Sequence, residues 1–183
     1  DKQRLENYLE SVRLETRENI ENLQSALKQA RFFKEKADTI KVLIASKRFM
    51  DSRLGTTAPL MTNPVGYQPL FTTIENIKES GDFNLIKDYA LRKELVNTYE
   101  SLKGTATSEQ NTQEYIRDFI DPYFFNKVRY STNYPIDPTD FITDHRFENI
   151  AIAYSNLMNQ QIDDYNSVLD KLQTLQQSLD DTE

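Results

Sequence analysis

The chain has 183 residues, 38% of them hydrophobic, which is enough apolar side chain for the core of one domain. Its net charge of -7 argues against a nucleic-acid-binding protein, which normally presents a concentrated basic face, and the absence of cysteine excludes disulfides, thiol nucleophiles and thiolate zinc sites. With only 4 glycines and 6 prolines, long uninterrupted tracts remain, and these predict an all-α fold.

The first tract predicts one long helix from about Lys2 to about Met50. Apolar side chains recur there at steps of three and four residues, which is the spacing of the buried seam of a packed helix. The seam consists of Leu5, Leu9, Val12, Thr16, Ile20, Leu23, Leu27, Ala30, Phe33, Ala37, Ile40 and Ile44. Such a helix would be roughly 70 Å long, so we expect part of it to project as a stalk or to pair with another long helix.

The segment from Asp51 to Pro69 interrupts this pattern, because it holds two glycines and three prolines. Long segments of this kind are usually either functional or disordered. The apolar side chains Leu60, Met61 and Val65 favour an ordered crossover that lies against the helices.

A helical corner is predicted next, where two short helices meet at Gly81. Thr72 and Glu75 have the spacing of a capping box at the start of the first helix, and Gly81 stands where a residue in the left-handed conformation would end it. Asp88 can then cap a helix over residues 89–102. The structural corner is expected to consist of Gly81, Phe83, Leu85 and Ile86.

The sequence IKESGDFNLI at residues 77–86, followed by Leu91 and Arg92, resembles the SGN-x-x-LI…LR core of an uncharacterised family of small bacterial single-span membrane proteins. Asp82 stands where that family commonly has Asn, which leaves the capping chemistry intact. In the family one transmembrane helix precedes a long Glu- and Lys-rich helix. The resemblance implies a domain in the periplasm held to the bacterial inner membrane, and it implies no catalytic residues. Because the chain opens on Asp1 inside an expected helix, we expect that an N-terminal transmembrane helix has been removed.

The polar segment after Gly104 predicts a turn, with a further helix from about Glu109 that is kinked or restarted at Pro122. An aromatic belt follows, and its mixture of rings and cations can hold a ligand by stacking and cation–π contact. The belt consists of Tyr123, Phe124, Phe125, Tyr130, Tyr134 and Phe141, interleaved with Lys127 and Arg129. Packing of the same rings in the core and at its rim is the alternative. If a small-molecule site exists, we expect it between the 54–69 crossover and this belt. Its residues would be Tyr67, Arg129, Tyr130 and Tyr134.

Three carboxylates, Asp137, Asp140 and Asp144, lie close together before the last predicted helix. They could attract Ca²⁺, but the glycine of an EF-hand loop is missing, so capping by Asp140 or Asp144 is the favoured interpretation. His145 is the only histidine, which excludes a two-histidine metal site within one chain. No Ser, His and Asp arrangement points to nucleophilic catalysis. We therefore expect no metal, no cofactor and no catalytic residue.

The last predicted helix, from Phe147 to Leu179, repeats the long apolar seam of the first. A seam of this length stays apolar only if something covers it. We expect the two long helices to pair antiparallel within one chain, so that the chain ends lie together. In that register Leu5 and Leu9 would lie opposite Leu175 and Leu179. Pairing of each seam with a second copy of the chain is the alternative.

The expected fold is thus one helical domain, residues 1–183. Residues 1–27 and 160–183 would form a stalk, and residues 28–159 a head with three shorter helices. Residues 28–53 are net +5, with 8 basic and 3 acidic side chains, and we expect this basic stretch to face acidic residues of the head. The acidic residues expected to meet it are Asp118, Asp121, Asp137 and Asp140.

Three functions fit these features. The first, which the resemblance favours, is an extracytoplasmic sensing or protein-interaction domain of a single-pass membrane protein, with a partner protein or a second copy of the chain as its target. The second is a soluble coiled-coil scaffold or adaptor. The third is a metal-assisted or acid–base hydrolase that uses the carboxylates between Asp137 and Glu148. The absence of a recognisable catalytic motif favours the first two over the third.

Overall fold

The computed structural model describes residues 2–127 and 144–182, and within these ranges the chain is helical and holds no β-strand. Three long helices dominate, α1 (Lys2–Ala45), α4 (Tyr89–Tyr115) and α6 (His145–Asp180). The shorter elements are α2 (Ser52–Thr57), the 3-10 helices η1 (Ala58–Thr62) and η2 (Asp82–Leu85), α3 (Thr72–Glu79), the π-helix η3 (Ile116–Ile120) and α5 (Asp121–Phe125). The predicted all-α bundle with two long terminal helices is confirmed.

The chain forms two compact units, and each long helix contributes to both. Unit 1 comprises residues 1–27, 67–106 and 164–183, and unit 2 comprises residues 28–66 and 107–163. This division differs from the expected stalk and head, because the helical corner belongs to the same unit as both terminal segments. Polar contacts with distant partners hold the corner there, and the periodicity of a single helix does not reveal such contacts.

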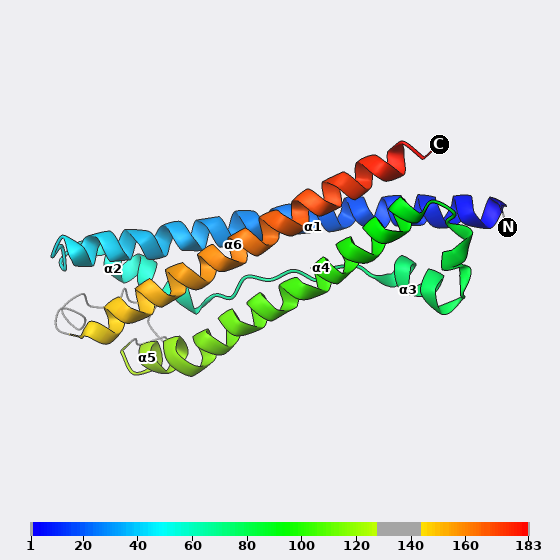
Figure 1. Ribbon diagram of the computed structural model, residues 1–183. Coiled ribbons are helices and arrows are strands. Elements are labelled where there is room, and N and C mark those ends of the chain that lie inside the picture. The colour runs from blue at the N-terminus through cyan, green and yellow to red at the C-terminus, as the bar shows by residue number, and fades with distance from the viewer. Residues whose placement is uncertain (1, 128–143, 183) are drawn as a thin grey trace. The chain divides into compact units, whose positions relative to one another are not determined.

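In unit 1 the end of α6 runs antiparallel beside the first half of α1, as expected (Figure 1). Arg13 of α1 donates from Nη2 to the carbonyl oxygen of Leu179 at 2.6 Å and lies 3.1 Å from the carboxylate of Asp180. A cation at this position satisfies a free carbonyl at the end of a helix and opposes the negative end of its dipole. These contacts place the end of α6 beside Arg13.

The first turns of α1 form polar contacts with the corner. Arg4 donates from Nη1 to both carboxylate oxygens of Asp82, at 2.8 and 2.9 Å, and the Tyr8 hydroxyl donates to the same carboxylate at 2.9 Å. The expected register of the two long helices is therefore wrong: α6 ends about two helical turns short of Leu5. The corner, through Asp82, lies beside the first two turns of α1, where the sequence analysis had placed the end of α6.

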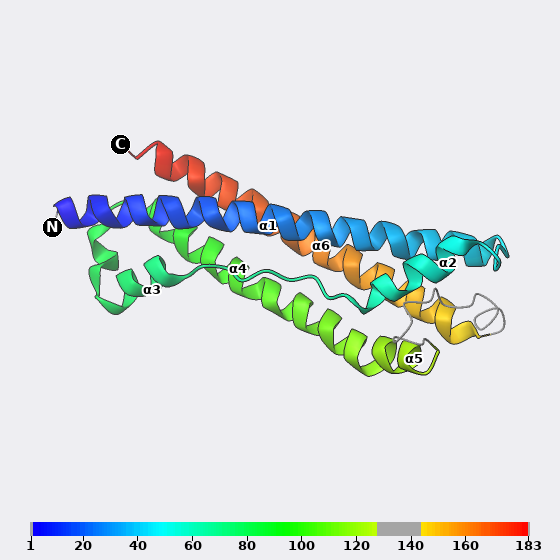
Figure 2. The same ribbon diagram turned by 180° about the vertical axis from the view of Figure 1, so that it is seen from behind.

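In unit 2 the second half of α1 lies beside the first half of α6, where the Ser155 hydroxyl donates to the Asp38 carboxylate at 2.7 Å. Figure 2 shows α2 beside the end of α1. The side chains of Leu54, Ala58 and Met61 from α2 and η1 are buried. The segment after α1 is therefore an ordered crossover, in agreement with the prediction.

The corner turns as predicted, but its first helix is capped differently. Gly81 has a φ of 76°, in the left-handed region, and Ile86 is buried while Phe83 and Leu85 are half-buried. Thr72 lies inside α3 and provides no cap. Instead, the buried carboxylate of Glu15 on α1 accepts from the Thr73 backbone N–H at 2.7 Å. The capping box was wrong because an acceptor distant in sequence takes its place.

Helix α4 continues through Gly104 and the polar segment that follows, so the predicted turn is wrong. The buried Thr105 hydroxyl donates to the Leu102 carbonyl at 2.8 Å, and the buried Thr112 hydroxyl donates to the Ser108 carbonyl at 3.0 Å. Hydroxyls that bond back to their own helix in this way do not need a turn or solvent. The chain restarts at α5 with Pro122 in the first turn, as predicted.

An extended segment, residues 63–71, joins η1 to α3. The N–H and carbonyl groups of an extended segment cannot form hydrogen bonds with one another as those of a helix do. Buried amide side chains of α1 and α6 provide partners for some of them. In unit 1 Asn19 accepts from the Leu70 N–H at 2.8 Å and donates to the Leu70 carbonyl at 3.0 Å. In unit 2 Gln161 donates to the Val65 carbonyl at 2.8 Å. Both amides are fully buried, and they supply the partners that buried backbone groups require.

Candidate functional site: a cationic cleft beside α1

Of the four residues expected at a small-molecule site, Tyr67 alone lies in the described part of the chain. Arg129, Tyr130 and Tyr134 lie outside it. Tyr67 packs edge-on against Tyr165 in unit 1, with 5.6 Å between the ring centroids and 85° between the ring planes. This is a favoured geometry for packed aromatic rings, so Tyr67 has a packing role.

Tyr123 of the aromatic belt lines a cavity of about 490 Å³ in unit 2, together with the earlier rings Tyr115 and Phe119. Two of its rings, Tyr115 and Phe119, stack with 5.0 Å between their centroids. Asp144 lies at the same cavity, where its carboxylate accepts from the Arg146 N–H at 3.1 Å and caps α6 as predicted. Asp137 and Asp140 lie outside the described residues.

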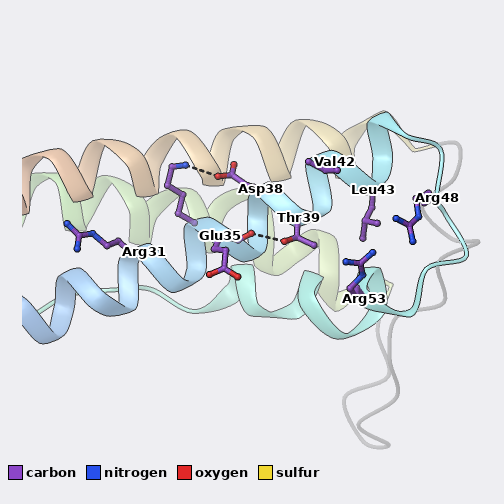
Figure 3. A pocket seen from close by; sticks show the side chains of 9 residues that line it. Arg31, Glu35, Asp38, Thr39, Val42, Leu43, Arg48 and Arg53 are labelled. Carbon is purple, nitrogen blue, oxygen red and sulfur yellow. Dashed lines mark hydrogen bonds and ion pairs between the residues drawn. The ribbon is translucent and has the colours of Figure 1, made fainter.

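A second cavity in unit 2, a cleft of about 500 Å³, gathers charged side chains (Figure 3). We call it the cationic cleft. One wall is a single face of α1, because residues three and four apart on a helix are neighbours. The opposite wall comes from the turn after α1 and from α2. The lining residues are Arg31, Lys34, Glu35, Asp38, Thr39, Val42, Leu43, Arg48 and Arg53.

Asp51 fixes the two arginines of the second wall. Its carboxylate accepts from Nε and Nη2 of Arg53 at 2.9 and 2.8 Å and from Nη2 of Arg48 at 2.9 Å. The hydrogen bonds from Arg53 hold the pKa of Asp51 well below its usual range, so the carboxylate stays ionised. The Asp51 side chain is only 12% exposed, whereas the arginines are more than half exposed. The guanidinium groups are thus held on one side and reach solvent on the other.

Asp38 plays a similar part on the α1 wall. Its carboxylate accepts from Lys34 at 2.7 Å, from Lys41 at 3.0 Å and from the Ser155 hydroxyl at 2.7 Å. Partial burial favours the neutral acid, but these hydrogen bonds outweigh it and lower the pKa of Asp38 to about 2. A single carboxylate therefore orders two ammonium groups.

The three carboxylates of residues 28–53, Glu35, Asp38 and Asp51, form their ion pairs within this stretch. Asp118 of the head, which the sequence analysis placed against the stretch, pairs instead with its neighbour Arg117. Four cationic side chains and two acidic ones line the cleft, which leaves a positive excess. The sequence analysis missed this site, although the net charge of +5 was its signal.

Comparison of the chain with protein-family models, with curated proteins and with solved structures gives no match. Within the described ranges, no helix is both long and apolar enough to cross a membrane. In the same ranges, no group of three or more His, Asp or Glu side chains is arranged to hold a metal ion.

Proposed function

We propose that this chain is a binding domain that recognises an acidic partner protein through the cationic cleft, and that it acts by binding and not by catalysis. The observation that carries the proposal is the uneven charge: residues 28–53 are net +5 in a chain of net -7, and one cleft collects four cations. A surface with an excess of one charge steers a partner of the opposite charge and selects against partners of like charge.

The proposal includes a cellular setting, the periplasmic face of a bacterial inner membrane, with the domain held by one N-terminal transmembrane helix and serving in sensing or protein interaction. The resemblance of residues 77–92 to small single-span membrane proteins supports this setting. A soluble coiled-coil scaffold is the alternative that the long helices α1 and α6 support. A reporter enzyme that is active only outside the cytoplasm, fused after Glu183 of the full-length protein, decides between them. Reporter activity supports the setting, and an inactive but stable fusion overturns it.

Binding is tested with a fluorescent peptide of ten glutamates, followed by anisotropy at low salt, with ten glutamines as the neutral control. Exposed ion pairs are worth about 0.2–1 kcal/mol, so Arg48→Gln or Arg53→Gln should each weaken binding by a factor of roughly 1.4 to 5. Arg117→Gln is the matched control, because it removes the same charge from an exposed ion pair of the same unit away from the cleft. Absence of binding, or an equal loss in the control, contradicts the proposal.

A further inference from the structure

The cationic side chains of the cleft form two groups and not one. Arg31 and Lys34 come from one end of the α1 wall, and Figure 3 shows Arg31 far from Arg48 and Arg53. The second group consists of Arg48 and Arg53 and lies at the other end of the wall. The backbone N–H of Arg48 donates to the Leu43 carbonyl at 2.8 Å, which holds the turn beside this end of α1. The cleft therefore offers two separate points of attraction for an anion.

The distance between the two points follows from the geometry of α1. Leu43 lies nine residues after Lys34 and twelve after Arg31, which corresponds to about 14–18 Å along the helix axis. A single carboxylate or phosphate is much smaller and can reach one point only. Glu35 lies between the points and would repel an anion placed there, whereas Asp38 is paired with Lys34 at 2.7 Å. A ligand that uses the whole cleft needs two anionic groups with a neutral spacer.

We infer that the cleft recognises an extended peptide segment with two acidic side chains four residues apart. In extended chain, alternate residues face the same side and each residue advances about 3.3 Å, so the side chains of residues i and i+4 share a face about 13 Å apart. The reach of the Arg and Lys side chains covers the remaining difference. The neutral middle of the segment lies near Thr39, a half-buried residue of the α1 wall between the two points. This inference rests on the proposed binding of an acidic partner and adds its spacing.

The test uses three capped peptides in which two glutamates are separated by one, three or five serines, measured by calorimetry against the whole chain. A peptide that contacts both cationic points at once binds more tightly than one that contacts a single point, provided that its serine spacer matches the distance between the points. We expect the three-serine peptide to bind about fivefold more tightly than the one-serine peptide. Inorganic phosphate serves as the single-point probe and should bind no better than the one-serine peptide.

Removal of one point should abolish the preference without abolishing binding. In the double variant Arg31→Gln and Lys34→Gln, which removes both cations of the first point, all three peptides should bind with the affinity of the one-serine peptide. Both residues lie on the surface of α1, and circular dichroism confirms that the variant is folded.

Equal binding of the three peptides to the unmodified chain overturns the spacing but leaves the proposed function standing. No binding of any peptide removes the proposed function itself. Peptide-independent association of two chains in sedimentation, weakened by Arg53→Gln, would identify a second copy as the occupant and overturn the inference.

Discussion

Glu15 is an acidic residue whose role depends on partners distant in sequence. Its side chain is buried, with 8% of the residue exposed. One carboxylate oxygen accepts from the Thr73 N–H and the other accepts from the Tyr99 hydroxyl, each at 2.7 Å. A buried carboxylate is costly unless such donors surround it. Glu15 therefore holds the start of α3 and the middle of α4 on the first half of α1.

Tyr99→Phe should lower the free energy of unfolding by about 1–3 kcal/mol, because it leaves a buried carboxylate oxygen without its donor. Urea unfolding followed by circular dichroism measures the change. Tyr8→Phe is the control, since it also removes a hydroxyl that donates to a carboxylate, but at the more exposed Asp82. An equal loss in the two variants would contradict the role given to Glu15.

Two buried tyrosines predict a loss of stability in alkaline solution. Burial raises the pKa of Tyr99, with a further contribution from Glu15, and burial also raises the pKa of Tyr154. In the unfolded chain both hydroxyls ionise near pH 10, whereas in the folded chain they keep their protons. The unfolded state therefore releases protons first, and stability falls as the pH rises above about 10. Urea unfolding between pH 8 and 11 should show this fall, with a smaller slope in Tyr154→Phe. A slope that the substitution does not change would contradict it.

At the scale of elements, the corner and α4 show which signals a sequence carries. Gly81 was predictable, because a left-handed residue ends a helix through a local rule. The continuation of α4 through Gly104 was not, because its polar residues are satisfied by carbonyls of the same helix and covered by the rest of the bundle. The cap on α3 and the amides that bind the extended segment were missed for a related reason. Each depends on a pairing between residues far apart in the chain.

Gly81 and Gly104 make a matched pair for testing the two elements. A Cβ built on either glycine meets no atom within 4 Å, so the backbone alone decides the effect. Gly81→Ala should destabilise the chain by about 1 kcal/mol, because its left-handed φ is costly for any residue with a Cβ, and Gly81→Val should cost at least as much. Gly104→Ala should stabilise it by about 0.5–1 kcal/mol, because Gly104 lies inside a helix. Thermal unfolding measures both, and changes of the same sign would refute this account.

At the scale of the whole molecule, the fold class and the antiparallel course of α1 and α6 were predictable, since long apolar seams must be covered. The register of these helices and the grouping of the corner with the terminal segments were not. The apolar seams determine only which face of each helix is buried. The polar contacts of Arg4, Arg13 and Asp82 determine which turns of α1 lie beside the corner and which lie beside the end of α6. The sequence shows that residues 28–53 are basic. It does not show that cations from α1 and from α2 line one cleft, because that depends on the turn after α1.

Spin labels at Glu6 and Thr182 test whether α1 and α6 pair within one chain. Arg13 lies beside Leu179, and Glu6 lies seven positions before Arg13 on the same helix, so we expect a distance of about 10–20 Å between the labelled positions. Dilution of doubly labelled chain with unlabelled chain should leave this distance unchanged. A distance above about 40 Å would contradict the pairing, and a short distance that disappears on dilution would show pairing between two chains.

The pairing of Asn19 with Leu70 has a consequence for divergence during evolution. Its amide donates one N–H to the Leu70 carbonyl and accepts from the Leu70 N–H at its oxygen, as a peptide group would. Asp has the same shape but replaces the donor with an acceptor, Leu removes both groups, and Gln moves them by one methylene. No single replacement keeps the match, so drift at this site should be far slower than at exposed positions of the same helix. Distant relatives of this chain should therefore keep an Asn here, even where their cleft residues and surface charges have changed.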